Sequence, residues 1–448
     1  MTELSKYSFA KTRNPSLCHG LFLFQGGIGL KSKVMSLILV TGLIISLFAF
    51  LPQTKADAAE NPGNDYPIVL VHGLGGWGEG EFLGYNYWGG LKDVQQYLED
   101  LGHETFVASV GPVASNYDRS VELYYYIKGG TVDYGAAHAN QHGHERYGRT
   151  YEGVYPEWDA DHPVHLVGHS MGGLTTRGLV DLLVDGSEEE REYHQAHPEE
   201  EMSALFEGDK SWVHSVTSIA TPHNGSTYAD DENRIISLVK DLVISVGAVS
   251  GIAEENLVYD FKLDHWGIRR EPGESFNSYL SKVINSKVWE STDISAYDLS
   301  TPGAVVLNEK VETKSDVYYF SYTGQTSKKE LLTGYHIPSV YTHPFLYQPT
   351  SFLGKFKRTN PNDGPIIDKT WWANDGLVST VSSFYPFEHP AKAYNGVPEK
   401  GKWNYYPIKS NWDHIDFIGI LSLSSKAKAF DVYPLYKEIA ENVHSLEE

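Results

Sequence analysis

The chain has 448 residues, enough for one large domain with insertions, and 13% of them are aromatic. Its formal charge at pH 7 is −22. A nucleic-acid partner is therefore not expected, because binding to phosphates requires a basic face. The single cysteine, Cys18, lies near the start, so the remainder of the chain cannot form an internal disulfide.

An apolar run at residues 35–51 follows two lysines and precedes the small-residue sequence Ala56-Asp57-Ala58. This arrangement predicts a secretory signal. Residues 1–58 would be a leader that is cut near Ala58, and residues 59–448 would form a single extracellular domain. An N-terminal membrane anchor is the alternative, although the run is short for a membrane span.

Residues 67–71 read PIVLV, which predicts a buried strand, and they run into the glycine-rich loop HGLGG at 72–76. A loop of this kind can point backbone N–H groups at an oxyanion, or it can simply be a tight turn. The Leu74 N–H is our candidate donor. An amphipathic helix over 91–101 and a second strand over 105–110 are expected next.

The regular pattern stops at residues 116–151, a stretch too long for a plain connection, and an insertion is expected there. The stretch holds His138, His142 and His144 among small and polar residues. Imidazoles combined with carboxylates suit Zn²⁺, so the histidines are metal-ligand candidates. Histidines exposed to solvent in a loop are the alternative.

Residues 163–183 read PVHLVGHSMGGLTTRGLVDLL, an apolar strand, a G-x-S-x-G motif and then apolar residues at helical spacing. A strand–turn–helix around this motif is typical of a nucleophile elbow, in which Ser170 stands at the start of a helix. The helix dipole there favours developing negative charge. The Met171 N–H would be the second donor to an oxyanion.

A strand over 213–220 is followed by His223, a competing catalytic histidine whose place directly after a strand favours a role in loop structure. Residues 235–252 are apolar over more than one helical face. They predict either a buried helix or a lid that covers the site in water and meets lipid when open. Lys240 and Asp241 interrupt this run, which argues against a membrane span.

Strands over 317–322 and 405–408 and a closing helix over 430–443 complete the pattern. The alternation of strands and helices predicts an α/β fold, with a mostly parallel central sheet flanked by helices.

A serine hydroxyl becomes a nucleophile when a histidine takes its proton and an acid orients that histidine. In the α/β-hydrolase fold the chain order is serine, acid, histidine, which selects His414 after the last predicted strand. Asp375, in an Asp-Gly turn, is the preferred acid. Asp368 and Asp413 are weaker candidates, because a carboxylate adjacent to His414 in sequence rarely reaches the far ring nitrogen.

Several long segments carry a resemblance that goes beyond this motif: PIVLVHGLGGWG, GGTVDYGAAHANQHGHERYGRTY, VYDFKLDHWGIRR, PGESF and NDGLV. The chain resembles the secreted bacterial lipases of the Geobacillus–Staphylococcus group over nearly all of its length after the leader. This resemblance implies an α/β-hydrolase fold and a triacylglycerol lipase. The expected substrate is a triacylglycerol or another ester at a lipid–water interface, and no obligatory protein partner is evident in the sequence. It also implies Ser170 as nucleophile, Asp375 as acid and His414 as base.

The resemblance further implies a zinc site that fixes the inserted region, with ligands at Asp118, His138, His144 and Asp293 and with His142 outside the set. Two imidazoles and two carboxylates would close a tetrahedral shell, so the zinc would be structural. The resemblance supports the lid interpretation, with the lid at about 226–260.

The family's calcium site is only partly matched. Asp416 fits its first acid, but the second position falls near Leu421 and Ser422, which offer no carboxylate. Calcium prefers several anionic oxygens, so a Ca²⁺ site is possible but incomplete in this sequence.

Other functions remain open at this stage. A carboxylesterase, a phospholipase or an acyltransferase could use the same catalytic groups. A secreted binding protein on an inactive hydrolase scaffold is the alternative from another class, and the intact serine, acid and histidine argue against it.

Overall fold

The computed structural model describes residues 63–79, 81–82, 84–249, 259–420 and 431–447. The predicted leader, residues 250–258 of the predicted lid, and Leu421 and Ser422 lie outside these residues. All described residues belong to one structural unit, Asn61–Glu448.

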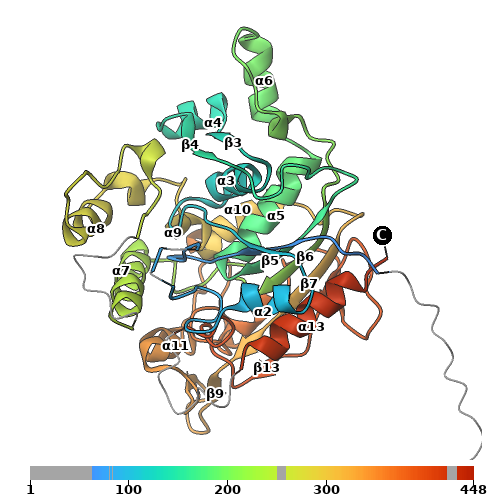
Figure 1. The fold of residues 1–448 in the computed structure, drawn as a ribbon. Coiled ribbons are helices and arrows are strands. Elements are labelled where there is room, and N and C mark those ends of the chain that lie inside the picture. Colours follow the sequence, from blue (N-terminus) through green and yellow to red (C-terminus); the bar gives the residue numbers. More distant parts are fainter. Residues whose placement is uncertain (1–62, 80, 83, 250–258, 421–430, 448) are drawn as a thin grey trace, which may run out of the picture. The chain divides into compact units, whose positions relative to one another are not determined.

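A seven-stranded sheet in which every strand pair is parallel forms the centre of the fold (Figure 1). The strand order is β11-β12-β7-β6-β5-β1-β2. This confirms the predicted mostly parallel sheet. The bounds are β1 Ile68–Val71, β2 Thr105–Val107, β5 Val164–His169, β6 Val213–Ile219, β7 Tyr318–Tyr322, β11 Ala391–Ala393 and β12 Trp403–Tyr405.

The last strands differ from the prediction. The strand expected over 405–408 is instead β12, which ends at Tyr405, and the short edge strand β11 was not predicted. Within the described residues, three further two-stranded sheets lie outside the central one. Their strands are β3 Gly130–Asp133, β4 Tyr147–Tyr151, β8 Gly324–Gln325, β9 Ser327–Lys329, β10 His336–Pro338 and β13 Lys409–Ser410.

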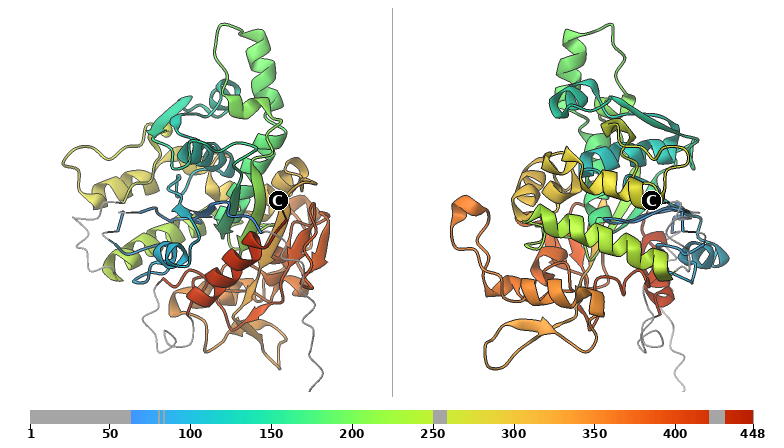
Figure 2. Two further views of the ribbon diagram at one scale, coloured as in Figure 1. Left: turned by 45° about the vertical axis from the view of Figure 1, so that its right-hand side comes forward. Right: turned by 90° about the vertical axis from the view of Figure 1, so that its left-hand side faces the viewer.

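Helices cover both faces of the sheet (Figures 1 and 2). Side chains alternate along a strand, so β1 sends Ile68 and Leu70 into one core and Val69 into the other. The described α-helices are α2 Val94–Asp100, α3 Asn116–Lys128, α4 Ala136–His142, α5 Met171–Val184, α6 Glu188–Ala196, α7 Glu232–Val249, α8 Phe276–Ile284, α9 Ser295–Asp298, α10 Thr301–Lys310, α11 Tyr347–Leu353, α12 Thr380–Phe384 and α13 Tyr433–His444.

The region predicted as an irregular insertion, 116–151, begins with a regular element. Its first thirteen residues form α3, which begins after an N-cap bond from the Asp118 N–H to the Ser115 hydroxyl. The helix is buried along most of its length and packs against α5. Only the remainder, with α4 and the β3–β4 hairpin, lies outside the layers of the fold.

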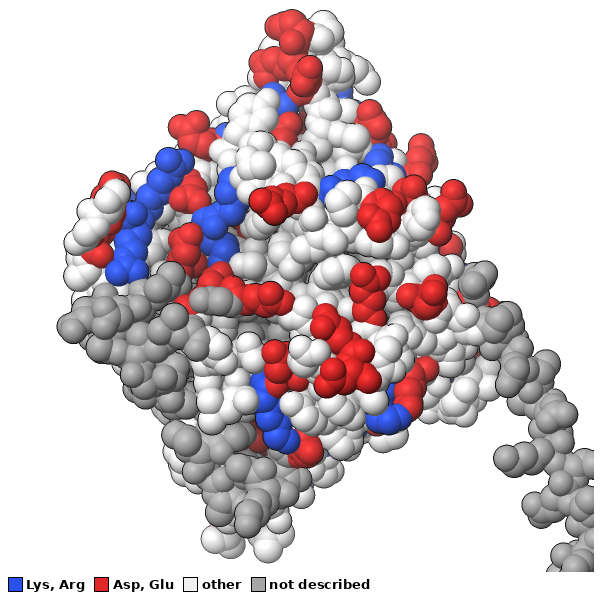
Figure 3. Space-filling model, in the orientation of Figure 1, with Lys and Arg blue, Asp and Glu red and all other residues white. Residues whose placement is uncertain are grey.

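Among the described residues no helix combines the length and apolar character that a membrane span needs. Acidic side chains outnumber basic ones on the face drawn in Figure 3, in line with the net charge of −22.

Among the buried histidines of the described residues, burial lowers the pKa of four well below its usual value: His72, His165, His169 and His223. They stay neutral in the folded chain. The unfolded chain binds protons below about pH 6.5 that the folded chain cannot bind, so stability is lost as the pH falls through that value.

The free energy of unfolding should therefore drop by roughly 5 kcal/mol between pH 7.5 and pH 5.5 from these four groups together. His165 offers a direct test, because its ring bonds to the Ser215 hydroxyl and the Asn64 side-chain oxygen, contacts that glutamine can reproduce. Urea unfolding of His165→Gln at both pH values should show about 1.4 kcal/mol less pH dependence than the parent. An unchanged pH dependence would contradict this account.

Candidate active site

Ser170 stands at a sharp bend between the end of β5 and the start of α5. Its backbone has φ 55° and ψ −126°, a conformation that non-glycine residues rarely adopt. Glycines allow the surrounding chain to pack tightly. A Cβ on Gly172 would lie 2.0 Å from the Val71 carbonyl oxygen, and one on Gly168 would lie 2.4 Å from the Gly172 carbonyl carbon. The predicted strand–turn–helix is therefore present.

The structure brings the three predicted catalytic residues together. The His414 Nε2 lies 2.9 Å from the Ser170 hydroxyl oxygen, and its Nδ1 lies 2.9 Å from Oδ2 of Asp375. The other Asp375 oxygen accepts hydrogen bonds from the Leu377 and Val378 N–H groups at 3.0 and 2.8 Å. Asp375 is thus fixed by its own turn, and it can hold His414 with Nε2 toward the serine.

The competing residues lie elsewhere. Asp368 is exposed and caps a short 3-10 helix. Asp413 accepts hydrogen bonds from the His343 and Asp416 N–H groups. His223 bonds to the Ser218 hydroxyl and packs on Trp403, in keeping with the predicted role in loop structure.

The glycine-rich loop after β1 leaves one amide available next to Ser170. The Gly73, Gly75 and Gly76 N–H groups donate to Tyr87, Pro112 and Gly73 respectively. Within the described chain the Leu74 N–H has no such acceptor, and Leu74 lines the same pocket as Ser170. The Met171 N–H opens α5 beside the serine. Leu74 therefore lies in the same pocket as the nucleophile and Met171 directly follows the nucleophile in sequence, and their role as oxyanion donors stays a prediction.

A buried hydrogen-bonded chain that sequence reasoning missed connects these parts. The Gly73 N–H donates to the Tyr87 hydroxyl at 2.9 Å, and this hydroxyl lies 2.7 Å from Nδ1 of His169. The His169 Nε2 lies 3.0 Å from the His414 carbonyl oxygen, so it carries the proton and Nδ1 accepts from Tyr87. Burial raises the pKa of Tyr87 and lowers that of His169, which keeps both neutral.

Tyr87→Phe should lower stability by about 2–4 kcal/mol, because it leaves the Gly73 N–H and the His169 nitrogen buried without partners. It should also lower kcat about tenfold, because Gly73 directly precedes the Leu74 donor. Urea unfolding and ester-hydrolysis kinetics measure both. The control is Tyr433→Phe, whose hydroxyl accepts one exposed bond from the Asp93 N–H, and which should change stability by less than about 0.5 kcal/mol.

Arg119 is a second missed residue, fully buried on α3. Its guanidinium donates to the carbonyl oxygens of His72 and Gly111 and to the Thr175 hydroxyl on α5. Burial lowers its pKa to about 10, so it remains charged at neutral pH. Arg119 thus connects the start of the glycine-rich loop at 72–76 to helix α5, which follows Ser170.

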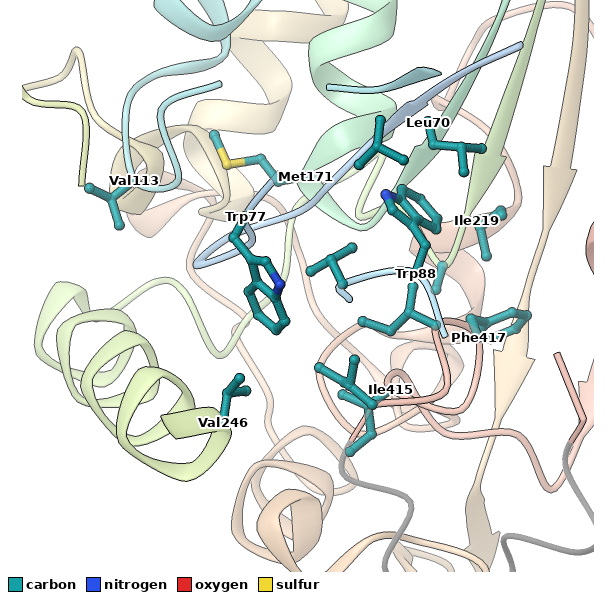
Figure 4. Packing of buried hydrophobic residues seen from close by; sticks show 14 of the residues in the cluster. Leu70, Trp77, Trp88, Val113, Met171, Ile219, Val246, Ile415 and Phe417 are labelled. Atoms are coloured by element: carbon teal, nitrogen blue, oxygen red, sulfur yellow. The ribbon is translucent and has the colours of Figure 1, made fainter. Parts of the chain in front are cut away.

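An apolar pocket opens above Ser170 and His414, and α7 forms one wall of it. Ile235, Leu238, Val239 and Leu242 of α7 line the pocket. The helix also contributes to the core, where Trp77 lies between Met171 and Val246 of α7 (Figure 4). The apolar helix expected over 235–252 is present as α7 up to Val249 and lines the site, and the choice between a buried helix and a lid stays a prediction.

The four residues implied as zinc ligands, Asp118, His138, His144 and Asp293, form one cluster whose ligand atoms lie within 4.8 Å of one another. The His138 Nε2 is 3.2 Å from both an Asp118 and an Asp293 oxygen. His142 lies beside the His138 ring but outside the cluster, as expected.

Two atoms of the cluster fit a bound cation. The His144 Nδ1 lies 2.9 Å from the Glu145 carbonyl oxygen and donates to it, which leaves the Nε2 lone pair for a metal. This Nε2 and Oδ2 of Asp293 are buried 3.3 Å apart, and neither makes a well-oriented hydrogen bond. His265, which sequence reasoning missed, places Nε2 3.0 Å from the second Asp118 oxygen and orients that carboxylate.

Asp416, the candidate calcium ligand, is paired with Asp413. Its N–H and one oxygen bond to the Asp413 side chain and N–H at 3.0 and 2.9 Å. The second calcium position lies outside the described residues, and the calcium site stays a prediction.

Comparison with known proteins agrees with this geometry. The family model described as "Lipase-like, C-terminal domain" matches residues 64–448. A lipase of Staphylococcus epidermidis is 41% identical over 396 residues, 87% of this chain, and the chain spans 55% of that relative's length.

Two solved structures are similar over most of the chain. EstA from Clostridium botulinum is 43% identical with a TM-score of 0.82, covering 88% of this chain and 90% of that one. Lipase 1 from Pelosinus fermentans is 47% identical with a TM-score of 0.77, covering 86% of this chain and 99% of that one.

Proposed function

The chain belongs to the family of bacterial lipases that includes the staphylococcal enzymes, and from this premise we propose that it is a secreted lipase. It hydrolyses the carboxylic ester bonds of triacylglycerols at a lipid–water interface. The observation that carries this proposal is the hydrogen-bonded series from Ser170 through His414 to Asp375, placed beneath an apolar pocket.

In the proposed reaction, His414 takes the proton of Ser170 as the serine oxygen attacks the ester carbonyl. The Leu74 and Met171 N–H groups stabilise the oxyanion that forms. His414 then gives its proton to the leaving alcohol. Water, activated by the same ring, releases the fatty acid from the acyl-enzyme, while Asp375 holds the imidazole in the required tautomer.

The proposed metal is Zn²⁺, since two imidazoles and two carboxylates match its preferred ligands and close its coordination shell. Held by Asp118, His138, His144 and Asp293, it would join α3, α4 and the segment after α8. Its proposed role is structural, and no catalytic step depends on it.

The substrate class is tested by hydrolysis of a triglyceride series from short to long acyl chains, below and above each substrate's solubility limit. A lipase should retain activity on long chains and increase its rate once the substrate aggregates. Activity confined to short dissolved esters would identify a carboxylesterase instead, and preferential release from phospholipids would identify a phospholipase.

A further inference from the structure

Exposed apolar side chains gather in one short segment. Of the fifteen large hydrophobic residues that are exposed in the described chain, six lie within residues 331–347. Leu331 and Leu332 are 98% and 93% exposed. Single exposed apolar residues are ordinary on a protein surface, whereas a concentrated group marks a contact with another apolar phase or partner.

The hairpin that carries the two leucines holds them in a fixed position. Its strands β9 and β10 pair antiparallel, and the His336 N–H at its base donates to the Gly354 carbonyl oxygen. In the tip, Glu330 and Tyr335 are joined by a 2.7 Å backbone bond and the Gly334 N–H donates to the Glu330 oxygen at 2.9 Å. These bonds close the turn, and both leucines extend into solvent.

The chain that follows this hairpin leads directly to the wall of the proposed active-site pocket. The chain continues from β10 into a 3-10 helix, Pro344–Leu346, whose Phe345 lines the pocket, and then into α11. The Arg234 guanidinium at the start of α7 lies 4.0 Å above the Phe352 ring of α11. Figures 1 and 2 show α7, α11 and the hairpin in succession.

The charge of this segment is opposite to that of the chain. Residues 326–358 contain five basic residues and one acidic residue, in a chain whose net charge is −22. Four of the basic residues are exposed lysines, Lys328, Lys329, Lys355 and Lys357. The single acid, Glu330, accepts a hydrogen bond from Thr333 within the tip. An anionic surface would repel most of the protein and attract this part of it.

We propose that the β9–β10 hairpin is a lipid-docking element, which inserts Leu331 and Leu332 into an anionic lipid–water surface while the surrounding lysines contact its charged groups. Docking in this way presents the pocket entrance beside α7 to the surface. The inference deepens the proposed lipase function, because it concerns how the same site reaches an aggregated substrate.

The experiment measures co-sedimentation of the full chain with vesicles of phosphatidylcholine alone and of phosphatidylcholine with 30% phosphatidylglycerol. A Ser170→Ala background avoids hydrolysis of the vesicles. Leu331→Glu/Leu332→Glu should weaken binding to the anionic vesicles roughly 100-fold. Lys328→Ala/Lys329→Ala should weaken it roughly 20-fold and should leave the weaker binding to phosphatidylcholine unchanged.

The matched control is Val305→Glu/Val306→Glu, which places the same charges on two adjacent exposed apolar residues of α10 and should leave binding unchanged. Equal binding by the parent and the leucine variant, or equal loss in the control, would overturn the proposal. With Ser170 present, the leucine variant should hydrolyse a dissolved short ester at the parental rate and an emulsified triglyceride far more slowly. If the parent protein were inactive on both substrates, the proposed lipase function would be refuted. The vesicle experiment would still show whether the hairpin docks on lipid.

Discussion

Replacing Ser170 by alanine is expected to lower kcat/KM for a triglyceride by roughly 10⁶-fold, because the attacking oxygen is removed while the pocket and oxyanion donors remain. The fold should be retained, since the Ser170 N–H bond to the Ile219 carbonyl oxygen does not involve the side chain. Hydrolysis rates at equal protein concentration, together with urea unfolding, measure the two effects separately.

Ser226→Ala is the control for this experiment. Ser226 lines the same pocket, but its hydroxyl donates to the Leu377 carbonyl oxygen and not to a histidine. This variant should keep activity within a few-fold of the parent and should still be labelled by a serine-directed phosphonate, whereas Ser170→Ala should not be labelled. Substantial turnover by Ser170→Ala would disprove the proposed mechanism.

Removal of the proposed metal should cause the second largest effect, and this effect should be on stability. A ligand held at about a thousand times its Kd stabilises the folded state by about 4 kcal/mol. Asp118 and Asp293 are both buried. Without the metal ion, the negative charges of their carboxylates would be neutralised less completely, which destabilises the folded state. Dialysis against a chelator should lower Tm by roughly 5 °C, and added Zn²⁺ should restore it, as followed by calorimetry.

Asp293→Asn should reproduce the low Tm and should abolish the response to both chelator and zinc. His142→Ala is the control, since His142 lies in the same loop but outside the cluster, and its Tm should still respond as the parental Tm does. Elemental analysis of the purified protein identifies the ion. A chelator-resistant Tm in a protein free of bound metal would rule out a structural metal.

The main features of the catalytic site were predictable because they follow local rules. A glycine-flanked serine between a strand and a helix defines an elbow wherever it occurs, and the chain order then selects Asp375 and His414. The bonds of Tyr87 and Arg119 could not be predicted in this way. They join residues far apart in sequence, such as Tyr87 and His169, and no local pattern records such a pair.

Helix α3 was not predicted from the sequence for a different reason. Its buried face includes Asp118, Arg119 and Glu122, so charged residues occupy positions where a buried helix normally carries apolar ones. Their charges are compensated by His138 and His265, by backbone carbonyls and by Tyr134, none of which lies on α3. In the sequence of α3, charged residues therefore interrupt the apolar residues at helical spacing from which a buried helix is predicted. Strand β11, with three residues at a sheet edge, was too short to give a signal.

Asp118 and Arg119 are neighbours on one turn of α3, yet one belongs to the proposed metal cluster and the other holds the loop before Leu74. The stability expected from the proposed metal and the turnover expected from the proposed mechanism would then both depend on this one turn of α3. Directed evolution that reshapes this turn for use in hot detergent or solvent will alter the reaction rate as well. The two traits cannot be selected independently there.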